Sequence, residues 1–207
     1  RSGVFNTENG DHTWTVSDGK IEFPKNKKWQ HYVDSRRLEI TCGEAPYLVS
    51  RYDVSTGELI VPPIRRIGIL DRKLRIVNEN TDTYEEWVKW TIRAFEASYG
   101  YEYQGDNVLI ARINLLLTFT DYYEERWERK PDSKLLQQMA NKIAWNIWQM
   151  DGLKGTVPLG KPYEEFEQMT LFNMLGMEET AEAEAVPCRI SDWRSKTSLK
   201  FMDLKER

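Results

Sequence analysis

Residues 37–52 (RLEITCGEAPYLVSRY) restrict the possible folds more than any other stretch of this chain. An apolar, β-prone run from Leu38 to Cys42 predicts a buried strand, and Gly43 breaks this run. Apolar residues then resume at helical spacing, which predicts a helix carrying Tyr47, Leu48, Val49 and Tyr52. A strand that turns through glycine into a helix directs the free N–H groups of the helix into the neighbouring crevice. Such turns hold cofactors in doubly wound α/β sheets, although an ordinary strand, turn and helix has the same pattern.

Two further β-prone runs each follow a predicted helix. The first, residues 98–103, is aromatic and carries Glu102 near its end. The second, residues 145–150, runs into an Asp-Gly turn at Asp151, and a continuous helix over residues 133–150 is the competing interpretation. Alternating strands and helices favour an α/β fold, with a mostly parallel sheet and flanking helices.

In such a sheet the carboxyl ends of neighbouring strands meet at one edge, which would bring Gly43, Glu102 and Asp151 together. A carboxylate that ends the second strand can accept hydrogen bonds from both hydroxyls of a ribose. An acidic turn after the third strand can accept the amino group of an adenine. Exposed acidic residues at strand ends also commonly serve only as helix caps. The functional interpretation therefore depends on the joint placement of Glu102 and Asp151 after the glycine turn.

Helices are predicted where apolar periodicity follows a capping residue. A capping box joins Thr83 to Glu86, and Asp106 and Ser133 are the expected N-caps of the next two helices. The remaining helices are predicted over residues 29–35 and 70–77. The expected core faces contain Trp87, Val88, Ile92 and Phe95, then Leu109, Ile110, Ile113, Leu116 and Leu117, then Leu135, Leu136, Met139 and Ile143.

The domain organisation follows from shifts in composition along the 207 residues. We expect a hairpin or loop segment over 1–34, with strands near 13–16 and 20–23, and a core over 35–153 with an insertion at about 53–80. A mobile acidic insertion is expected over 154–186, containing a short helix near 166–175, followed by a return toward the core over 187–207.

Composition excludes several classes of function. No apolar run approaches the roughly 20 residues of a membrane helix, and no signal peptide opens the chain, so a cytoplasmic location is expected. Two cysteines and two isolated histidines give neither a disulfide framework nor a metal site. The net charge of −4 is unlike that of a stand-alone nucleic-acid binder. The chain begins at Arg1 without an initiator methionine, as expected of a piece of a longer protein.

Three motifs resemble those of the N6-adenine DNA methyltransferases. LEITCGEAPYLV is similar to motif I, usually D/E-P-A-C-G-S-G-x-F-L, and its matching positions are Glu39, Cys42, Gly43, Tyr47 and Leu48. YGYEYQGDNVLIARINLLLTF is similar to the second motif, with Glu102 as the acidic residue. NIWQMDGL resembles the third, with Asp151 in the acidic position. Nearly the whole chain resembles the large methylase subunits of restriction–modification systems, called restriction endonuclease subunit M.

The resemblance implies a partial Rossmann-like fold of the class I methyltransferases, with S-adenosylmethionine (SAM) as cofactor. The implied cofactor-binding residues are Glu39, Thr41, Cys42, Gly43, Glu44 and Ala45 near the methionine part, Glu102 at the ribose, and Tyr103, Asp151 and Gly152 near the adenine. In the intact enzyme a target adenine leaves the DNA duplex and receives the methyl group on N6. Its catalysis would consist largely of positioning and electrostatics.

The chain departs from the family pattern at several points. Ala45 replaces the second glycine and Pro46 follows it, which stiffens the turn. The distance from Gly43 to Glu102 exceeds the roughly 20 residues of a compact unit, so the insertion at 53–80 is expected to loop out. The catalytic N/D-P-P-Y/F tetrapeptide is absent, since Val61-Pro62-Pro63-Ile64 lacks both the amide or carboxylate and the aromatic ring.

We therefore expect no catalytic residue in this chain and no methylation by it alone. Double-stranded DNA would be bound by other parts of the parent protein, with a restriction endonuclease or specificity subunit as a further partner. A non-catalytic scaffold is the alternative, with an interface made of Trp87, Trp90, Trp145 and Trp148. A nicotinamide dehydrogenase is disfavoured, because the turn after Gly43 does not supply G-x-G-x-x-G.

Overall fold

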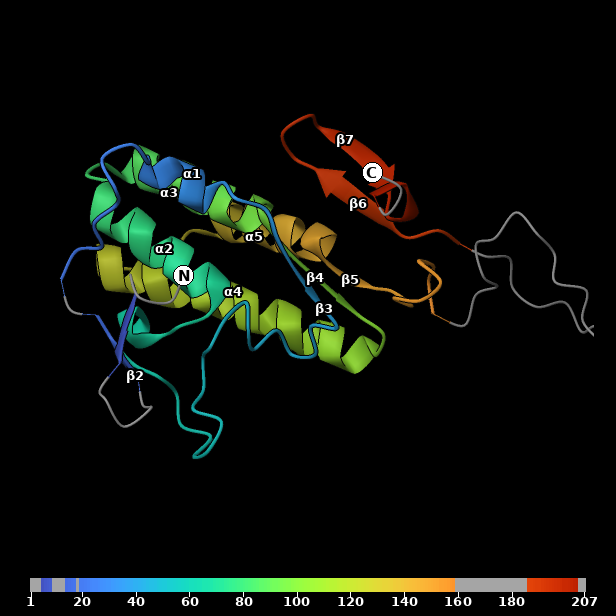
Figure 1. Ribbon diagram of the computed structural model, residues 1–207, viewed down its shortest axis with the longest axis horizontal. Coiled ribbons are helices and arrows are strands. Elements are labelled where there is room, and N and C mark those ends of the chain that lie inside the picture. Colours follow the sequence, from blue (N-terminus) through green and yellow to red (C-terminus); the bar gives the residue numbers. More distant parts are fainter. Residues whose placement is uncertain (1–4, 9–13, 18, 159–185, 205–207) are drawn as a thin grey trace, which may run out of the picture.

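A three-stranded parallel sheet lies at the centre of the protein (Figure 1). The computed structural model describes residues 5–8, 14–17, 19–158 and 186–204. The strands β3 (Arg37–Ile40), β4 (Ser98–Glu102) and β5 (Ile147–Gln149) lie in the order β3-β4-β5. The predicted parallel α/β arrangement is confirmed, and it is compatible with a partial Rossmann-like fold. The strand at 147 also excludes a continuous helix over 133–150, because α5 ends at Asn146.

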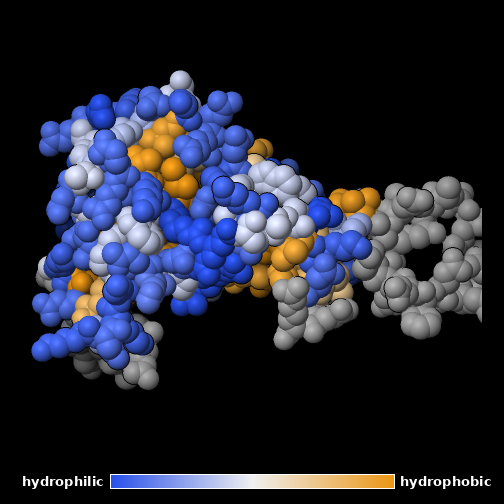
Figure 2. Space-filling model, turned by 90° about the horizontal axis from the view of Figure 1, so that it is seen from above, coloured by the Kyte–Doolittle hydropathy of each residue, from blue (hydrophilic) through white to orange (hydrophobic). Residues whose placement is uncertain are grey.

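Helices pack on one face of this sheet and form the larger core. They are α1 (Trp29–Val33), α2 (Ile69–Asn80), α3 (Tyr84–Glu96), α4 (Gly105–Trp127) and α5 (Ser133–Asn146). Cys42 and Ile147 from the sheet side join this core, together with Trp87, Phe95, Phe119 and Met139 from the helices. The surface over α1 and α3, seen from above, is mostly hydrophilic with small separate apolar patches (Figure 2). No helix in the described part of the chain is long and apolar enough to cross a membrane.

The other face of the sheet is covered in part by a C-terminal antiparallel hairpin, β6 (Arg189–Asp192) and β7 (Thr197–Lys200). This hairpin (red in Figure 1) lies beside the C-terminal end of α5. A second, smaller core joins it to the sheet through Tyr101, Met150, Cys188 and Phe201. The side chains of Leu38 and Ile40 remain 44% and 47% exposed, so the prediction that the first strand is buried was wrong. β3 is an edge strand whose outer face the hairpin leaves largely uncovered.

The N-terminal segment forms a hairpin from β1 (Asn6–Glu8) and β2 (Trp14–Val16), and only β2 matches one of the two predicted strands. Residues 20–23 are not a strand. Ile21 is instead buried, and its N–H donates to Glu79 Oε2 at 2.8 Å. Most of the predicted acidic insertion, including the helix expected near 166–175, lies outside the described residues. Two 3₁₀ turns complete the described elements, Pro63–Arg65 and Met202–Leu204.

The predicted N-cap is correct for α3, and the N-caps of α4 and α5 lie earlier in the chain than predicted. Thr83 Oγ1 accepts the N–H of Glu86 at 3.2 Å, as predicted. The N-cap of α4 is Gln104, and the predicted cap Asp106 lies inside the first turn. The N-cap of α5 is Asp132, whose Oδ1 accepts the N–H of Leu135 at 2.8 Å, so Ser133 is the first helical residue. Shifts of one or two residues are common because several polar residues precede each helix.

The predicted core face of α4 was wrong. The buried residues are Val108, Ala111, Leu115, Thr118, Phe119, Tyr122 and Tyr123. Four of the five expected core residues are exposed: Leu109, Ile110, Ile113 and Leu117. Apolar residues occur all round the first half of this helix, so periodicity alone cannot distinguish its two sides. The large aromatic residues of its second half decide the orientation, because they bury more area than the aliphatic face.

The segment predicted to loop out, 53–80, has two unlike halves. Residues 53–59 are all exposed, and a bridge between Tyr52 and Leu59 closes this excursion. The second half is α2, whose Leu70, Leu74, Ile76 and Val77 are buried in the main core. Part of the additional sequence between β3 and β4 therefore belongs to the core.

Candidate functional site

The carboxyl ends of the three parallel strands meet as the sequence predicted. The N–H of Gly43, after β3, donates to Oε2 of Glu102 at 2.7 Å. The N–H of Met150, after β5, donates to the carbonyl of Glu102 at 2.8 Å. The turn at Gly152 reaches back toward β3, since a Cβ on Gly152 would lie 3.7 Å from Cγ2 of Ile40. The predicted site residues thus gather at one edge of the sheet.

The turn after β3 differs from the prediction, because no helix follows it. Gly43 and Ala45 have φ values of 51° and 65°, and Pro46 comes next, so the chain makes successive turns. The first helix after this turn is α2, whose Ile69 and Leu70 donate their N–H groups to carbonyls of the turn residues. Consequently the turn after β3 contributes no helix N-terminus of its own to the strand ends, and the helix that begins there is α4, directly after β4.

Ala45 keeps the backbone conformation that a glycine would adopt easily. It occupies the position of the second glycine of motif I, with a left-handed φ of 65°. Its N–H donates to the carbonyl of Cys42 at 2.7 Å, and its methyl group is fully buried. The departure in sequence is therefore compatible with a tight turn.

Glu39 supplies a buried acceptor beside this turn. Its Oε2 accepts the N–H of Leu48 at 3.1 Å. Its Oε1 is buried and has no hydrogen-bond partner among the described residues. Burial raises the pKa of this carboxyl to about 7. An orphaned carboxylate oxygen of this kind suits an ammonium or N–H donor from a ligand.

The side chain of Glu102 links the carboxyl ends of β3 and β4 by a hydrogen bond. Its side chain is nearly buried, Oε2 accepts from Gly43, and Oε1 accepts the N–H of Gln104 at 3.1 Å. A carboxylate offers about four lone-pair sites, so both oxygens retain acceptor capacity. Open space lies next to the turn, because a Cβ on Gly43 would meet no atom within 4 Å.

Asp151 organises the third turn. Its Oδ1 accepts the N–H groups of Leu153 and Lys154 at 3.0 and 3.1 Å, which is an Asx-type turn. Tyr103 is 43% exposed beside it, and its carbonyl accepts from Nε2 of Gln149 at 3.0 Å. An exposed aromatic ring next to an acidic turn can stack on a planar ligand.

The remaining predicted residues have different surroundings. Cys42 is buried, and burial raises the pKa of its thiol to about 12, with the charges of Glu39 and Glu102 adding to the effect. At neutral pH the group is therefore a thiol, which is the less reactive form of cysteine. Thr41 and Glu44 are exposed.

Two residues that support the site were missed. Asn114 donates from Nδ2 to the carbonyl of Glu44 at 3.1 Å, and Gln149 holds the carbonyl of Tyr103. A polar side chain within the apolar part of α4 is the only sequence signal for Asn114, and nothing in the sequence marks Gln149.

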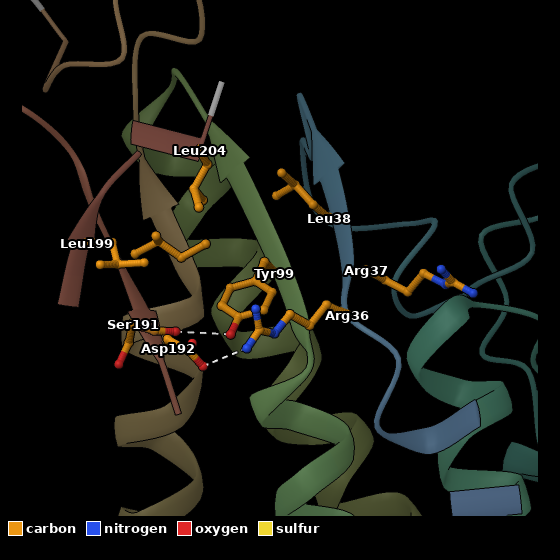
Figure 3. Close-up of a pocket in the computed structure, with 9 residues that line it drawn as sticks. Arg36, Arg37, Leu38, Tyr99, Ser191, Asp192, Leu199 and Leu204 are labelled. Carbon is orange, nitrogen blue, oxygen red and sulfur yellow. Dashed lines mark hydrogen bonds and ion pairs between the residues drawn. The ribbon is translucent and has the colours of Figure 1, made fainter. Parts of the chain in front are cut away.

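A cavity of about 190 Å³ lies elsewhere, between β3, β4 and the C-terminal hairpin (Figure 3). The hydroxyl of Tyr99 donates to the carbonyl of Ser191 at 3.0 Å, and Arg36 pairs with Asp192 at 2.7 Å. Apolar side chains of Leu38, Ile190, Leu199 and Leu204 complete the lining. None of the predicted cofactor-binding residues contributes to this cavity.

Comparisons with protein-family models, with curated proteins and with solved structures found no match. The likeness to DNA methyltransferases therefore depends on the motifs and their placement alone. Among the residues that the structure describes, no cluster of three or more His, Cys, Asp or Glu side chains could hold a metal ion.

Proposed function

We propose that this chain is the SAM-binding part of a DNA adenine-N6 methyltransferase of a bacterial restriction–modification system. The observation that carries the proposal is the hydrogen bond from Gly43 to Glu102, with the Asp151 turn beside it. This contact joins the first two motifs at the edge of a parallel sheet where ligands of α/β proteins bind.

The residues present fit the parts of SAM. The orphaned Oε1 of Glu39 can accept the ammonium of the methionine part, and the open space at Gly43 admits the chain of the ligand. Glu102 keeps lone pairs for the ribose hydroxyls. Tyr103 and the Asp151 turn can stack on the adenine and accept its amino group.

When bound, the cofactor would supply a methyl group on a positively charged sulfur. The residues of this chain would hold and orient it, so their contribution to catalysis is positioning. The chain has no N/D-P-P-Y/F tetrapeptide, and the groups that hold the target adenine would belong to the rest of the parent protein. Methyl transfer and DNA binding are therefore proposed for the parent protein.

Isothermal titration with SAM tests this proposal. We expect the wild-type protein to bind and Glu102→Ala to lose binding. The matched control is Asp106→Ala, which removes an exposed carboxylate four residues further on and should bind like wild type. Circular dichroism must show that Glu102→Ala stays folded under the titration conditions. Unchanged binding by folded Glu102→Ala, or no binding by wild type, would refute the proposal.

A non-catalytic scaffold is the second candidate, because both oxygens of Glu102 already accept backbone N–H groups. The predicted tryptophan interface is wrong for Trp87, which is fully buried. Trp145 is 40% exposed and stacks on Trp148 with ring centroids 5.9 Å apart, so this pair remains available. A scaffold should show no thermal shift with SAM or S-adenosylhomocysteine, whereas a ligand of the native state raises the midpoint.

A further inference from the structure

The outer side of α4 is apolar where a surface helix is usually polar. Leu109, Ile113 and Leu117 follow each other at four-residue spacing, with Ile110 beside them. Their exposed fractions are 59%, 47%, 41% and 37%. The opposite side of the same helix is buried in the main core. We call this row of four residues the α4 stripe. A helix with apolar residues on opposite sides is normally covered on both, so the α4 stripe indicates a surface that another protein segment covers.

The charges along the α4 stripe are acidic. Asp106 and Glu124 are exposed, and their spacing from Leu109 and Leu117 places them on the same side of the helix. Arg112, the basic residue within the length of the stripe, donates from its guanidinium to the carbonyls of Ala144 and Ile147. The Arg112 guanidinium therefore lies at the C-terminal end of α5, on the side of α4 away from Ile110.

We propose that the α4 stripe docks an amphipathic helix of another polypeptide, with apolar residues at i, i+3 or i+4, and i+7, flanked by lysine or arginine. Rows at four-residue spacing form the ridges by which helices interdigitate. Complementary charges along the rim then select a basic partner.

Two other occupants have the wrong charge. The stretch 159–185 of this chain contains seven glutamates and one lysine, so it would meet the acidic rim with like charge. A second copy of the protein, paired through α4, would bring the two acidic rims together. Like charges across an interface oppose association.

The test uses two labelled peptides with the same apolar face, LKKLLKLLKKLLKL and LEELLELLEELLEL, and fluorescence anisotropy against the full chain at low salt. We expect the lysine peptide to bind and the glutamate peptide not to bind. Ile113→Lys and Leu117→Lys should each weaken binding about tenfold or more, because each places a charge in the apolar contact. Leu153→Lys is the matched control, since Leu153 is 93% exposed and lies outside the stripe.

The double variant Asp106→Lys, Glu124→Lys should shift the preference toward the glutamate peptide. Equal binding of both peptides to wild type, absence of binding, or full affinity in both Ile113→Lys and Leu117→Lys would overturn the proposal. Sedimentation that shows a dimer abolished by Ile113→Lys would overturn it in favour of a second copy. This proposal does not depend on SAM binding, so the two can fail separately.

Discussion

Replacing Glu102 by glutamine tests how the strand ends are held together. The carboxylate accepts two backbone N–H groups, from Gly43 at 2.7 Å and from Gln104 at 3.1 Å. A glutamine amide keeps one acceptor oxygen and presents an NH₂ group to the other N–H, so one of these donors loses its partner. Hydrogen bonds to charged groups contribute about 1.5–3 kcal/mol, so Glu102→Gln should lower the free energy of unfolding by ~2 kcal/mol.

Urea unfolding followed by circular dichroism measures this loss. With a slope of about 2 kcal/mol per molar urea, the midpoint should fall by roughly 1 M. Glu44→Gln makes the same chemical change on an exposed side chain of the same turn and should stay within about 0.5 kcal/mol of wild type. If Glu102→Gln is no less stable than Glu44→Gln, the carboxylate does not fasten the strand ends and the geometric reasoning is wrong.

Two further predictions concern the same edge. A methyl group on Gly100 would lie 3.0 Å from Sγ of Cys42, so Gly100→Ala should cost about 1–3 kcal/mol in urea unfolding. Adding Cys42→Ala should restore part of this loss, and a cost that is unchanged would contradict the contact. Burial raises the pKa of Glu39 from 4.5 to about 7, so the carboxyl contributes stability at low pH that is lost as pH rises through 7. Relative to wild type, Glu39→Gln should therefore gain stability from pH 4 to pH 8 in thermal unfolding, and a parallel pH profile would refute the shift.

The strands could be predicted from sequence because each β-prone run is short and ends at a turn-forming residue. Gly43 and the Asp-Gly turn at Asp151 mark two of these ends, and Glu102 directly precedes a third turn. Their adjacency then follows from the general rule for parallel sheets. The residues that bind the turns from a distance, Asn114 and Gln149, could not be found, since local patterns contain no information on such contacts.

The failures have physical reasons of their own. Apolar spacing after Gly43 predicted a helix, but only one helical turn forms, in which the N–H of Val49 donates to the carbonyl of Ala45 at 2.9 Å. The carbonyls of Tyr47 and Leu48 accept the N–H groups of Ile69 and Leu70 of α2, so the helical hydrogen bonds do not continue. The C-terminal hairpin was not predicted, because its strands of four residues are mixed in polarity and are packed by distant partners such as Tyr101.

The two proposed roles of Glu102 are compatible and can be separated. A carboxylate held by Gly43 and Gln104 is already oriented, so a ribose would find its acceptors preorganised at little further entropic cost. A purely structural clamp predicts that Glu102→Gln loses stability while SAM has no effect on the wild-type midpoint. A cofactor site predicts the same loss of stability together with a SAM-dependent rise in wild type that the variant lacks. The comparison of midpoints with and without SAM therefore distinguishes a structural clamp from a cofactor site, because both interpretations share the hydrogen bonds and differ only in the ligand.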